Sequence, residues 1–242
     1  MSAHPASRRR GTVASALTSA AGWLIEPAPA PEAVEPAPAH REPRPVVAVA
    51  GLRRGSGVTT LARALGAALA VRDPCGGCVV TSTAGGASVP LGLPAGGRLS
   101  RRIAPLVDGR ARPCGRLCLV EDADRASLSA VAREVAPLVL DVSDPAEAAA
   151  AASVADHVLL VAGPETEPAL AAVVAESLGL VGPAPLVVVN RSGRASERWA
   201  AEPHVPVPES RLAAQLAGAG REPRGPVGQA VAALAERVGG GA

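Results

Sequence analysis

The sequence contains no lysine, no phenylalanine and no tyrosine, and its only aromatic residues are Trp23 and Trp199. All of its basic side chains are therefore arginine, so no other segment can supply a side-chain ammonium group to an anionic ligand. Without Phe and Tyr, the core has to be built from Ala, Val, Leu and a little Ile, which suits close packing of helices on a sheet. The formal net charge of +2 is too small to indicate nucleic-acid binding by itself.

The sequence also lacks an apolar run of the roughly 20 residues that a membrane-spanning helix needs. Arg8 to Arg10, followed by the more apolar residues 12–25, could suggest an export signal. However, Thr and Ser interrupt the apolar part, and no convincing cleavage site follows it. We therefore expect a cytoplasmic protein without a membrane span.

The 242 residues are enough for one α/β domain and a tail. Residues 1–45 are dominated by Ala, Pro, Glu and Ser, and 27–45 are especially rich in proline. This composition predicts a disordered tail that ends in an extended linker. The domain is predicted to cover residues 46–238, and residues 239–242 a flexible end.

Short apolar runs alternate with helical patterns along the predicted domain. We expect strands at residues 46–50, 79–83, 117–120, 138–140, 157–162 and 186–189, with a loop over 84–97. Continuous apolar strands that alternate with helices are typical of a parallel sheet covered on both faces. The predicted fold class is therefore a doubly wound, mostly parallel α/β sheet, similar to that of P-loop NTPases.

A glycine-rich loop follows the first predicted strand. Residues 51–57 read GLRRGSG, and a helical pattern begins at Thr59. A strand, a glycine loop and a helix in this order bring several backbone N–H groups and a helix N-terminus to one anion. The P-loop pattern is G-x-x-x-x-G-K-[ST]. Here the stretch from Gly51 to Gly57 is one residue too long, and Val58 stands where the pattern has lysine.

This stretch resembles the deviant P-loop K-G-G-x-G-K-[ST]-T of the ParA/MinD family of partitioning and septum-positioning ATPases. Arg53 falls on the signature lysine of that loop and Arg54 on a glycine, while Gly55, Ser56 and Gly57 keep the loop. Val58 falls on the second lysine. The resemblance implies that ATP or ADP binds along Gly51 to Thr60.

The resemblance also implies a magnesium ion. Thr59 would hold Mg²⁺, and Thr60 would contact a phosphate. Asp141 ends an apolar strand, as the Walker B aspartate of the family does, and is therefore the second expected Mg²⁺ ligand. The alternative is that Asp141 or Asp144 only caps the next helix.

A further match follows the strand at 186–189. The family has an asparagine here that recognises the adenine edge, so Asn190 and the adjacent Arg191 are expected at the nucleotide. The alternative is an asparagine selected for its turn geometry. Residues 205–210 and 220–223 also resemble the end of the family's domain. Within the family, the sequence most resembles the CpaE/TadZ-like branch, which is tied to pilus assembly and polar localisation.

Two departures from the family pattern indicate weakened ATP hydrolysis. Val58 replaces a phosphate-binding lysine, and the strand at 79–83 ends in Thr83 without the carboxylate that prepares the attacking water. The leading hypothesis is a localisation or scaffolding factor with weak or no ATP hydrolysis, which works through protein partners, a second copy of the chain being one candidate. One alternative is an active ATPase, in partitioning or in pilus or secretion positioning, that uses Arg53 and Arg54 in place of the lysines. Another is an unrelated doubly wound module that binds a different anion.

The four cysteines form two pairs, Cys75 with Cys78 and Cys114 with Cys118. If both pairs met at the amino edge of the sheet, they could form a Cys₄ zinc site. The wide separation of the pairs and the position of Cys118 inside an apolar strand argue against zinc. Reduced structural thiols are expected, and a disulfide is a further alternative. The last helix, near 227–238, has an apolar face but no basic face, so we expect it to pack in the core and not on a membrane.

Overall fold

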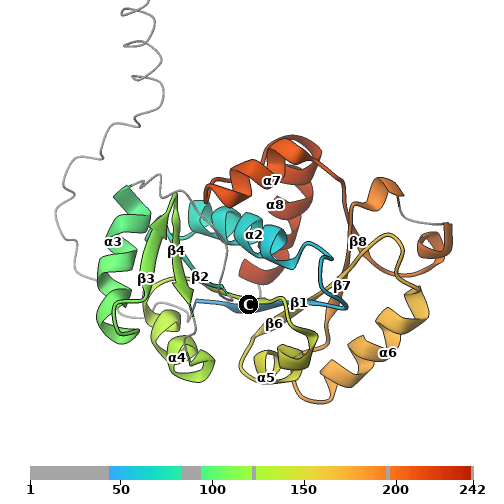
Figure 1. The fold of residues 1–242 in the computed structure, drawn as a ribbon, viewed down its shortest axis with the longest axis horizontal. Helices are drawn as coiled ribbons and strands as arrows, with labels where there is room; N and C mark the ends of the chain where they lie inside the picture. The colour runs from blue at the N-terminus through green and yellow to red at the C-terminus, as the bar shows by residue number, and fades with distance from the viewer. Residues whose placement is uncertain (1–43, 83–93, 122–123, 195–196, 241–242) are drawn as a thin grey trace, which may run out of the picture. The chain divides into compact units, whose positions relative to one another are not determined.

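The computed structural model describes residues 44–82, 94–121, 124–194 and 197–240, so nearly all of the predicted tail lies outside them. The described residues form an eight-stranded sheet in the order β3-β4-β2-β5-β1-β6-β7-β8 (Figure 1). Every strand pair is parallel except β3 with β4. This arrangement confirms the predicted doubly wound, P-loop NTPase-like fold.

The central strands are almost wholly apolar, as expected for a sheet that is covered on both faces. The strands are β1 (Val46–Gly51), β2 (Cys78–Ser82), β3 (Ala111–Cys114), β4 (Leu117–Glu121), β5 (Leu138–Val142), β6 (His157–Ala162), β7 (Leu186–Asn190) and β8 (Val205–Val207). The helices are α2 (Val58–Arg72), α3 (Pro94–Ile103), α4 (Arg125–Val135), α5 (Ala148–Ala152), α6 (Pro168–Gly179), α7 (Arg211–Gly218) and α8 (Gly225–Gly239).

The helices divide into two layers (Figure 1). Helices α2, α7 and α8 enclose one apolar core against the sheet, and α3, α4, α5 and the end of α6 enclose another on the opposite face. As expected, α8 packs in the core, with Val227, Val231, Leu234 and Val238 buried. None of the helices in the described ranges is long and apolar enough to cross a membrane.

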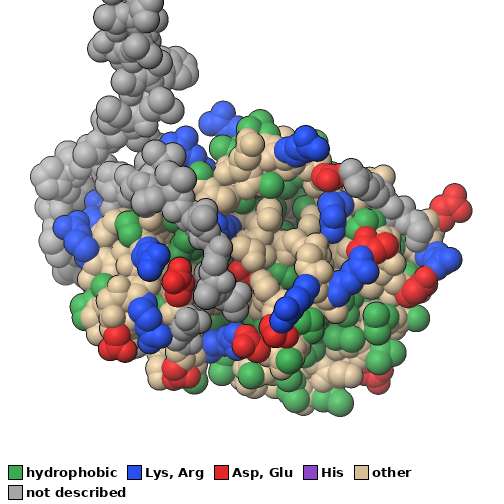
Figure 2. All heavy atoms as spheres, viewed as in Figure 1, with side chains coloured by type: hydrophobic (Ala, Val, Ile, Leu, Met, Phe, Trp, Pro, Cys, Tyr) green, Lys and Arg blue, Asp and Glu red, His purple; other side chains and the backbone are tan. Residues whose placement is uncertain are grey.

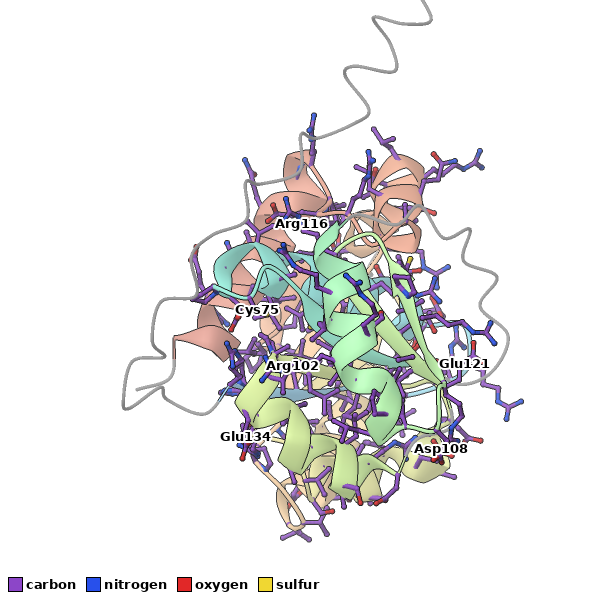
Figure 3. The ribbon with its side chains drawn as sticks, turned by 90° about the vertical axis from the view of Figure 1, so that its left-hand side faces the viewer. Cys75, Arg102, Asp108, Arg116, Glu121 and Glu134 are labelled. Carbon is purple, nitrogen blue, oxygen red and sulfur yellow. The ribbon has the colours of Figure 1, made fainter. Side chains whose placement is uncertain are left out.

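Two parts of the sequence prediction need correction. The antiparallel edge strand β3 was not expected, because its sequence Ala-Arg-Pro-Cys shows no strand pattern; proline is tolerated at a sheet edge because it has no N–H to pair. Residues 94–97 were expected to be loop, but they begin α3, which lies across β3 and β4 (Figure 3). Gly96 permits this contact, since a Cβ atom there would collide with the carbonyl of Gly115.

Arg44, just before β1, is tied to the folded domain although we expected it to belong to the tail. Its side chain is 7% exposed, its Nε donates to Asp73 Oδ2 at 2.7 Å, and its Nη1 donates to the carbonyl of Glu134 at 2.7 Å. Its backbone N–H donates to the carbonyl of Arg133 at 3.1 Å. These bonds fix the end of β1 that is remote from the glycine loop.

We predict that residues 1–42 are dispensable for folding and that Arg44 is not. A chain that begins at Pro43 should keep the free energy of unfolding of the full chain within about 0.5 kcal/mol. A chain that begins at Val46 should lose about 1.5–3 kcal/mol, since it lacks the charged hydrogen bonds of Arg44. Urea denaturation of the three proteins measures both values. A large loss in the chain that begins at Pro43 would refute the boundary.

A second prediction concerns pH. Burial by itself would raise the pKa of Asp73, but hydrogen bonds from Arg44 and Cys75 outweigh it and lower the pKa below its ordinary value. A carboxylate with a lowered folded-state pKa stabilises the fold above its unfolded pKa, and this contribution is lost as the pH falls through the folded value. Asp73→Asn should therefore cost about 1.5–3 kcal/mol at pH 7, and the cost should shrink as the pH falls below the ordinary aspartate value of about 3.9. A cost that does not change between pH 7 and acidic pH, measured by denaturation, would contradict this account.

Candidate functional site

The candidate site lies where the carboxyl ends of β1, β5 and β7 meet the start of α2. The chain leaves β1 through α2 toward β2 on one side, and it passes from β5 through α5 to β6 on the other side of β1. This reversal makes β1 a topological switch point, and open parallel sheets bind ligands in the crevice that such a point creates. The glycine loop follows β1 directly.

Two glycines give the loop its shape. Gly55 and Gly57 have φ angles of 82° and 92°, in the left-handed region that other residues rarely adopt. The second of them allows the chain to enter α2 at once, and the N–H of Leu61 donates to the carbonyl of Gly57 at 3.0 Å. Between the glycines, Ser56 is 1% exposed and its Oγ has no partner among the described residues. The loop therefore leads directly into the first turn of a helix, where backbone N–H groups have no partner within the helix.

Two residues at the carboxyl end of β7, Asn190 and Arg191, hold this loop from the side, and we call their hydrogen bonds to the loop the clasp. The Asn190 side chain donates from Nδ2 to the carbonyl of Ser56 at 2.9 Å and accepts the N–H of Arg191 at 3.0 Å. Arg191 has a φ of 57° and donates from Nη2 to the carbonyl of Gly55 at 3.1 Å. A Cβ atom on Gly57 would collide with Asn190 Nδ2, so the clasp requires glycine at that position. Asn190 and Arg191, which the sequence placed at the adenine base, thus lie at the loop. The Nδ2 and Oδ1 atoms of Asn190 both form hydrogen bonds within the protein.

A chain of hydroxyl groups connects the first turn of α2 to β5. Thr59 Oγ1 and Ser143 Oγ lie 3.1 Å apart, and Ser143 Oγ donates to Asp141 Oδ1 at 2.8 Å. Asp141 is 1% exposed, and its backbone N–H donates to Thr81 Oγ1 at 3.0 Å. Burial raises the pKa of Asp141, while hydrogen bonds from Thr59 and Ser143 act in the opposite direction.

This arrangement separates the two aspartates. Asp144 caps the next short helix, accepting the N–H of Ala146 at 3.1 Å, whereas Asp141 points to the start of α2 through Ser143. Thr59 and Asp141 could therefore share a Mg²⁺ ion whose other ligands are waters and phosphate oxygens, the usual pattern for this ion. The described residues contain no group of three or more His, Cys, Asp or Glu that could hold a metal without such help.

The two arginines of the loop are paired with carboxylates. Arg53 forms an ion pair with Glu165, and Arg54 Nη2 lies 3.3 Å from Asp144 Oδ2. Both arginine side chains are largely exposed, at 55% and 84%, and ion pairs of this kind are weak in water. In contrast to these exposed arginines, Val58, which stands where the P-loop pattern has lysine, is 5% exposed and belongs to the apolar core. A Cβ atom on Gly51 would lie only 2.6 Å from Val58 Cγ2.

A cavity of about 270 Å³ adjoins the loop. It is lined by the loop glycines 55 and 57, Asn190, Arg191 and residues 207–211, with apolar walls from α2, α7 and α8. Another cavity, of about 460 Å³, is lined by Pro45, Pro74 and Pro137 at the amino ends of the strands. Ligands of parallel sheets bind at the carboxyl ends, so the smaller cavity is the candidate site.

The four cysteines are free thiols that the structure does not bring to one point. Cys78 and Cys114 belong to the core on one face of the sheet, whereas Cys118 and Cys75 pack in the core on the other. Figure 3 labels Cys75, which lies on the turn after α2. Burial raises the pKa of Cys75 and of Cys118 to about 11. The geometry therefore gives no support to a Cys₄ zinc site.

Sequence reasoning missed two residues near the site. Ser143 follows Asp141 by two positions, the spacing that places side chains on the same face of a strand. Arg63 is the only charged residue in the interior of α2, and its side chain is buried. A lone charge inside an otherwise apolar helix was the signal that could have identified it.

The sequence matches no protein-family model and no curated protein sequence. Solved structures do share the fold. MinD of Pyrococcus horikoshii OT3, solved with Mg-ADP, has a TM-score of 0.55 at 20% identity over 81% of this chain and 96% of that one. The ATP complex of a Cyanothece McdA variant has a TM-score of 0.54 at 14% identity over 83% and 98%. A ParA family ATPase from Chlorobium tepidum TLS has a TM-score of 0.53 at 14% identity over 80% and 98%. At these identities the likeness establishes the fold.

The clasp can be tested by its effect on stability. Gly57→Ala and Gly55→Ala both place a side chain in the left-handed region, at a cost of about 1–2 kcal/mol each. Only Gly57→Ala also collides with Asn190, since nothing lies within 4 Å of a Cβ atom on Gly55. We expect Gly57→Ala to lower the free energy of unfolding more than Gly55→Ala does. In an Asn190→Ala background the two substitutions should cost the same.

A double-mutant cycle measured by urea denaturation gives this coupling. Gly55→Ala serves as the control for backbone strain. If Gly57→Ala has the same cost with and without Asn190, the clasp does not constrain the loop.

Proposed function

We propose that this chain is a ParA/MinD-like P-loop protein that binds ATP or ADP with Mg²⁺, hydrolyses ATP weakly or not at all, and acts as a localisation or scaffolding factor. The observation that carries the proposal is the glycine loop between β1 and α2, held by Asn190 on one side and linked through Thr59 and Ser143 to Asp141 on the other. The glycine loop, the hydroxyl groups of Thr59 and Ser143 and the carboxylate of Asp141 therefore lie together at the switch point of the sheet.

The residues present fit such a ligand. Nothing lies within 4 Å of a Cβ atom on Gly55, so the loop backbone is open there, and the buried Oγ of Ser56 has no partner among the described residues. Thr59 and Asp141 would hold Mg²⁺, which supplies charge to the phosphates when it is bound. The neighbouring cavity would take the base beside Asn190 and Arg191. The solved structures of the same fold with Mg-ADP and ATP support this assignment.

The case for weak hydrolysis rests on two missing groups. No ammonium can reach the phosphates, because the chain has no lysine and Val58 packs into the core. Among the described residues of β2, from Cys78 to Ser82, there is no carboxylate to position a water. Phosphoryl transfer depends on both charge stabilisation and positioning, so the loss of both should slow it severely.

The alternative expected from the sequence is an active ATPase in which Arg53 and Arg54 replace the lysines. In the structure both guanidinium groups face carboxylates, Glu165 and Asp144. These exposed pairs are weak enough to open, but a guanidinium that has to leave its partner is less well prepared than a fixed ammonium. The geometry therefore favours the scaffold hypothesis.

The outer side of α6 supports a function in protein contacts. Leu170, Val173, Leu180 and Val181 are 48–84% exposed at α6 and just after it, and apolar side chains gather over this part of the surface (Figure 2). Contiguous exposed apolar patches commonly mark protein–protein contacts. The CpaE/TadZ-like assignment and a homodimer are part of the same proposal.

The proposal predicts that Val58→Lys improves ATP binding without restoring turnover. A charged hydrogen bond to phosphate contributes about 1.5–3 kcal/mol, so affinity should rise about tenfold or more. Turnover also needs a positioned water, which the substitution does not supply. Titration calorimetry and a phosphate-release assay measure the two effects.

Val58→Met is the matched control, since it adds length without charge. The prediction is wrong if Val58→Lys binds ATP no better than Val58→Met. A wild-type protein that releases phosphate steadily would contradict the scaffold hypothesis and make Arg53 and Arg54 the first residues to replace.

A further inference from the structure

Arg63 is a buried guanidinium that has no hydrogen bond and no ion pair in the described part of the chain. Its residue is 6% exposed, and both Nε and Nη2 are buried with no hydrogen-bond partner among the described residues. None of the ion pairs found in those residues includes it. The other buried arginine, Arg44, has an aspartate at 2.7 Å.

Its place on α2 is fixed by two neighbours on the same helix stripe. Thr59, one turn earlier, faces Ser143 and Asp141 at the end of β5. Gly66, one turn later, packs on β2, since a Cβ atom there would lie 2.8 Å from Val80 Cγ2. Residues spaced by three and four positions share one helix face, and long side chains on a helix lean toward its N-terminus. Arg63 therefore extends over the carboxyl ends of β5 and β2, toward the end of α2 that carries the glycine loop.

An unpaired buried charge is costly. Removing a guanidinium from water without hydrogen-bonded compensation costs several kcal/mol. The charge of Asp141 acts on Arg63 through space, but no hydrogen bond or ion pair found in the described residues joins the two side chains. Arg125, which also acts on Asp141, already has its own partner, Glu147. The unpaired N–H donors of Arg63 would be satisfied by an anion with several acceptor oxygens.

We propose that Arg63 binds the terminal phosphate of the bound nucleotide and so replaces, from inside α2, the ammonium that this chain lacks. This inference rests on the proposed nucleotide site. A guanidinium offers several donors to phosphate oxygens, and an arginine one turn after Thr59 approaches the same phosphate edge from the side of β2. We therefore expect triphosphate to bind better than diphosphate, because a diphosphate lacks the phosphate that Arg63 is proposed to bind.

The test compares wild-type protein, Arg63→Met and Arg72→Met by calorimetric titration with Mg-ATP, Mg-ADP, adenosine and inorganic tripolyphosphate. Methionine keeps an unbranched apolar stem and removes the charge. Arg72 lies at the other end of α2, paired with Glu222 and Glu236, and serves as the control for loss of an arginine from this helix. Thermal denaturation of each protein, with and without tripolyphosphate, is measured in parallel.

We expect Arg63→Met to weaken ATP and tripolyphosphate binding about 10- to 100-fold, to change ADP binding less and adenosine binding not at all. The free Arg63→Met protein should melt at or above the wild-type temperature, because a buried unpaired charge has been removed, and tripolyphosphate should no longer raise it. Arg72→Met should bind all four ligands as the wild type does.

Unchanged ATP and tripolyphosphate affinities in Arg63→Met would overturn the inference. So would a lower melting temperature of the free Arg63→Met protein together with equal losses for ATP and ADP, since Arg63 would then serve only as a structural counter-charge for Asp141. If the wild type binds tripolyphosphate through Arg63 but gains no affinity from adenosine in ATP, the nucleotide proposal fails while the anion site at Arg63 stands. Wild-type protein that binds none of the phosphate ligands contradicts both.

Discussion

The close approach of Asn190 to Gly57 is the contact on which the geometry of the site depends. It allows an amide from β7 to hold the carbonyl of Ser56, and it is possible only because residue 57 has no side chain. The loop is thereby fixed between two strands that are not neighbours, β1 and β7, with β6 between them. The N–H of Ser56 donates within the loop, to the carbonyl of Arg53 at 3.4 Å. An anion site would use the remaining N–H groups of the loop and of the first turn of α2.

The charged groups around this loop differ from one another in kind and in burial. Hydroxyl groups and one buried carboxylate connect α2 to β5, so the groups suited to Mg²⁺ are present. The cations near the loop are arginines: Arg53 and Arg54 in exposed ion pairs, Arg191 bonded to the carbonyl of Gly55, and Arg63, which is buried on α2 without a hydrogen bond or ion pair among the described residues. Exposed charges are screened by water and salt, whereas a buried guanidinium is screened much less.

Much of the fold could be predicted from the sequence, because its central strands are continuous apolar runs and the loop between β1 and α2 is marked by glycine. Strand β6 matches its predicted range of 157–162, whereas β5 was expected to end in Asp141 and continues one residue further, to Val142. What escaped prediction depends on contacts between distant segments. Strand β3 has no pattern of its own and exists because it pairs with β4. Similarly, local sequence predicts neither the hydrogen bond from Asn190 to Ser56 nor the lack of a hydrogen-bond partner at Arg63. Both depend on which distant residues the fold brings close.

The measurement that tests the account most directly follows the fate of bound ATP. Wild-type protein is mixed with a slight excess of Mg-ATP, the bound fraction is separated by gel filtration, and the nucleotide is analysed by ion-exchange chromatography after prolonged incubation. The account predicts saturable binding to one site and recovery of the bound nucleotide as intact ATP. Recovery as ADP with stoichiometric phosphate, or the absence of any bound nucleotide, would contradict it.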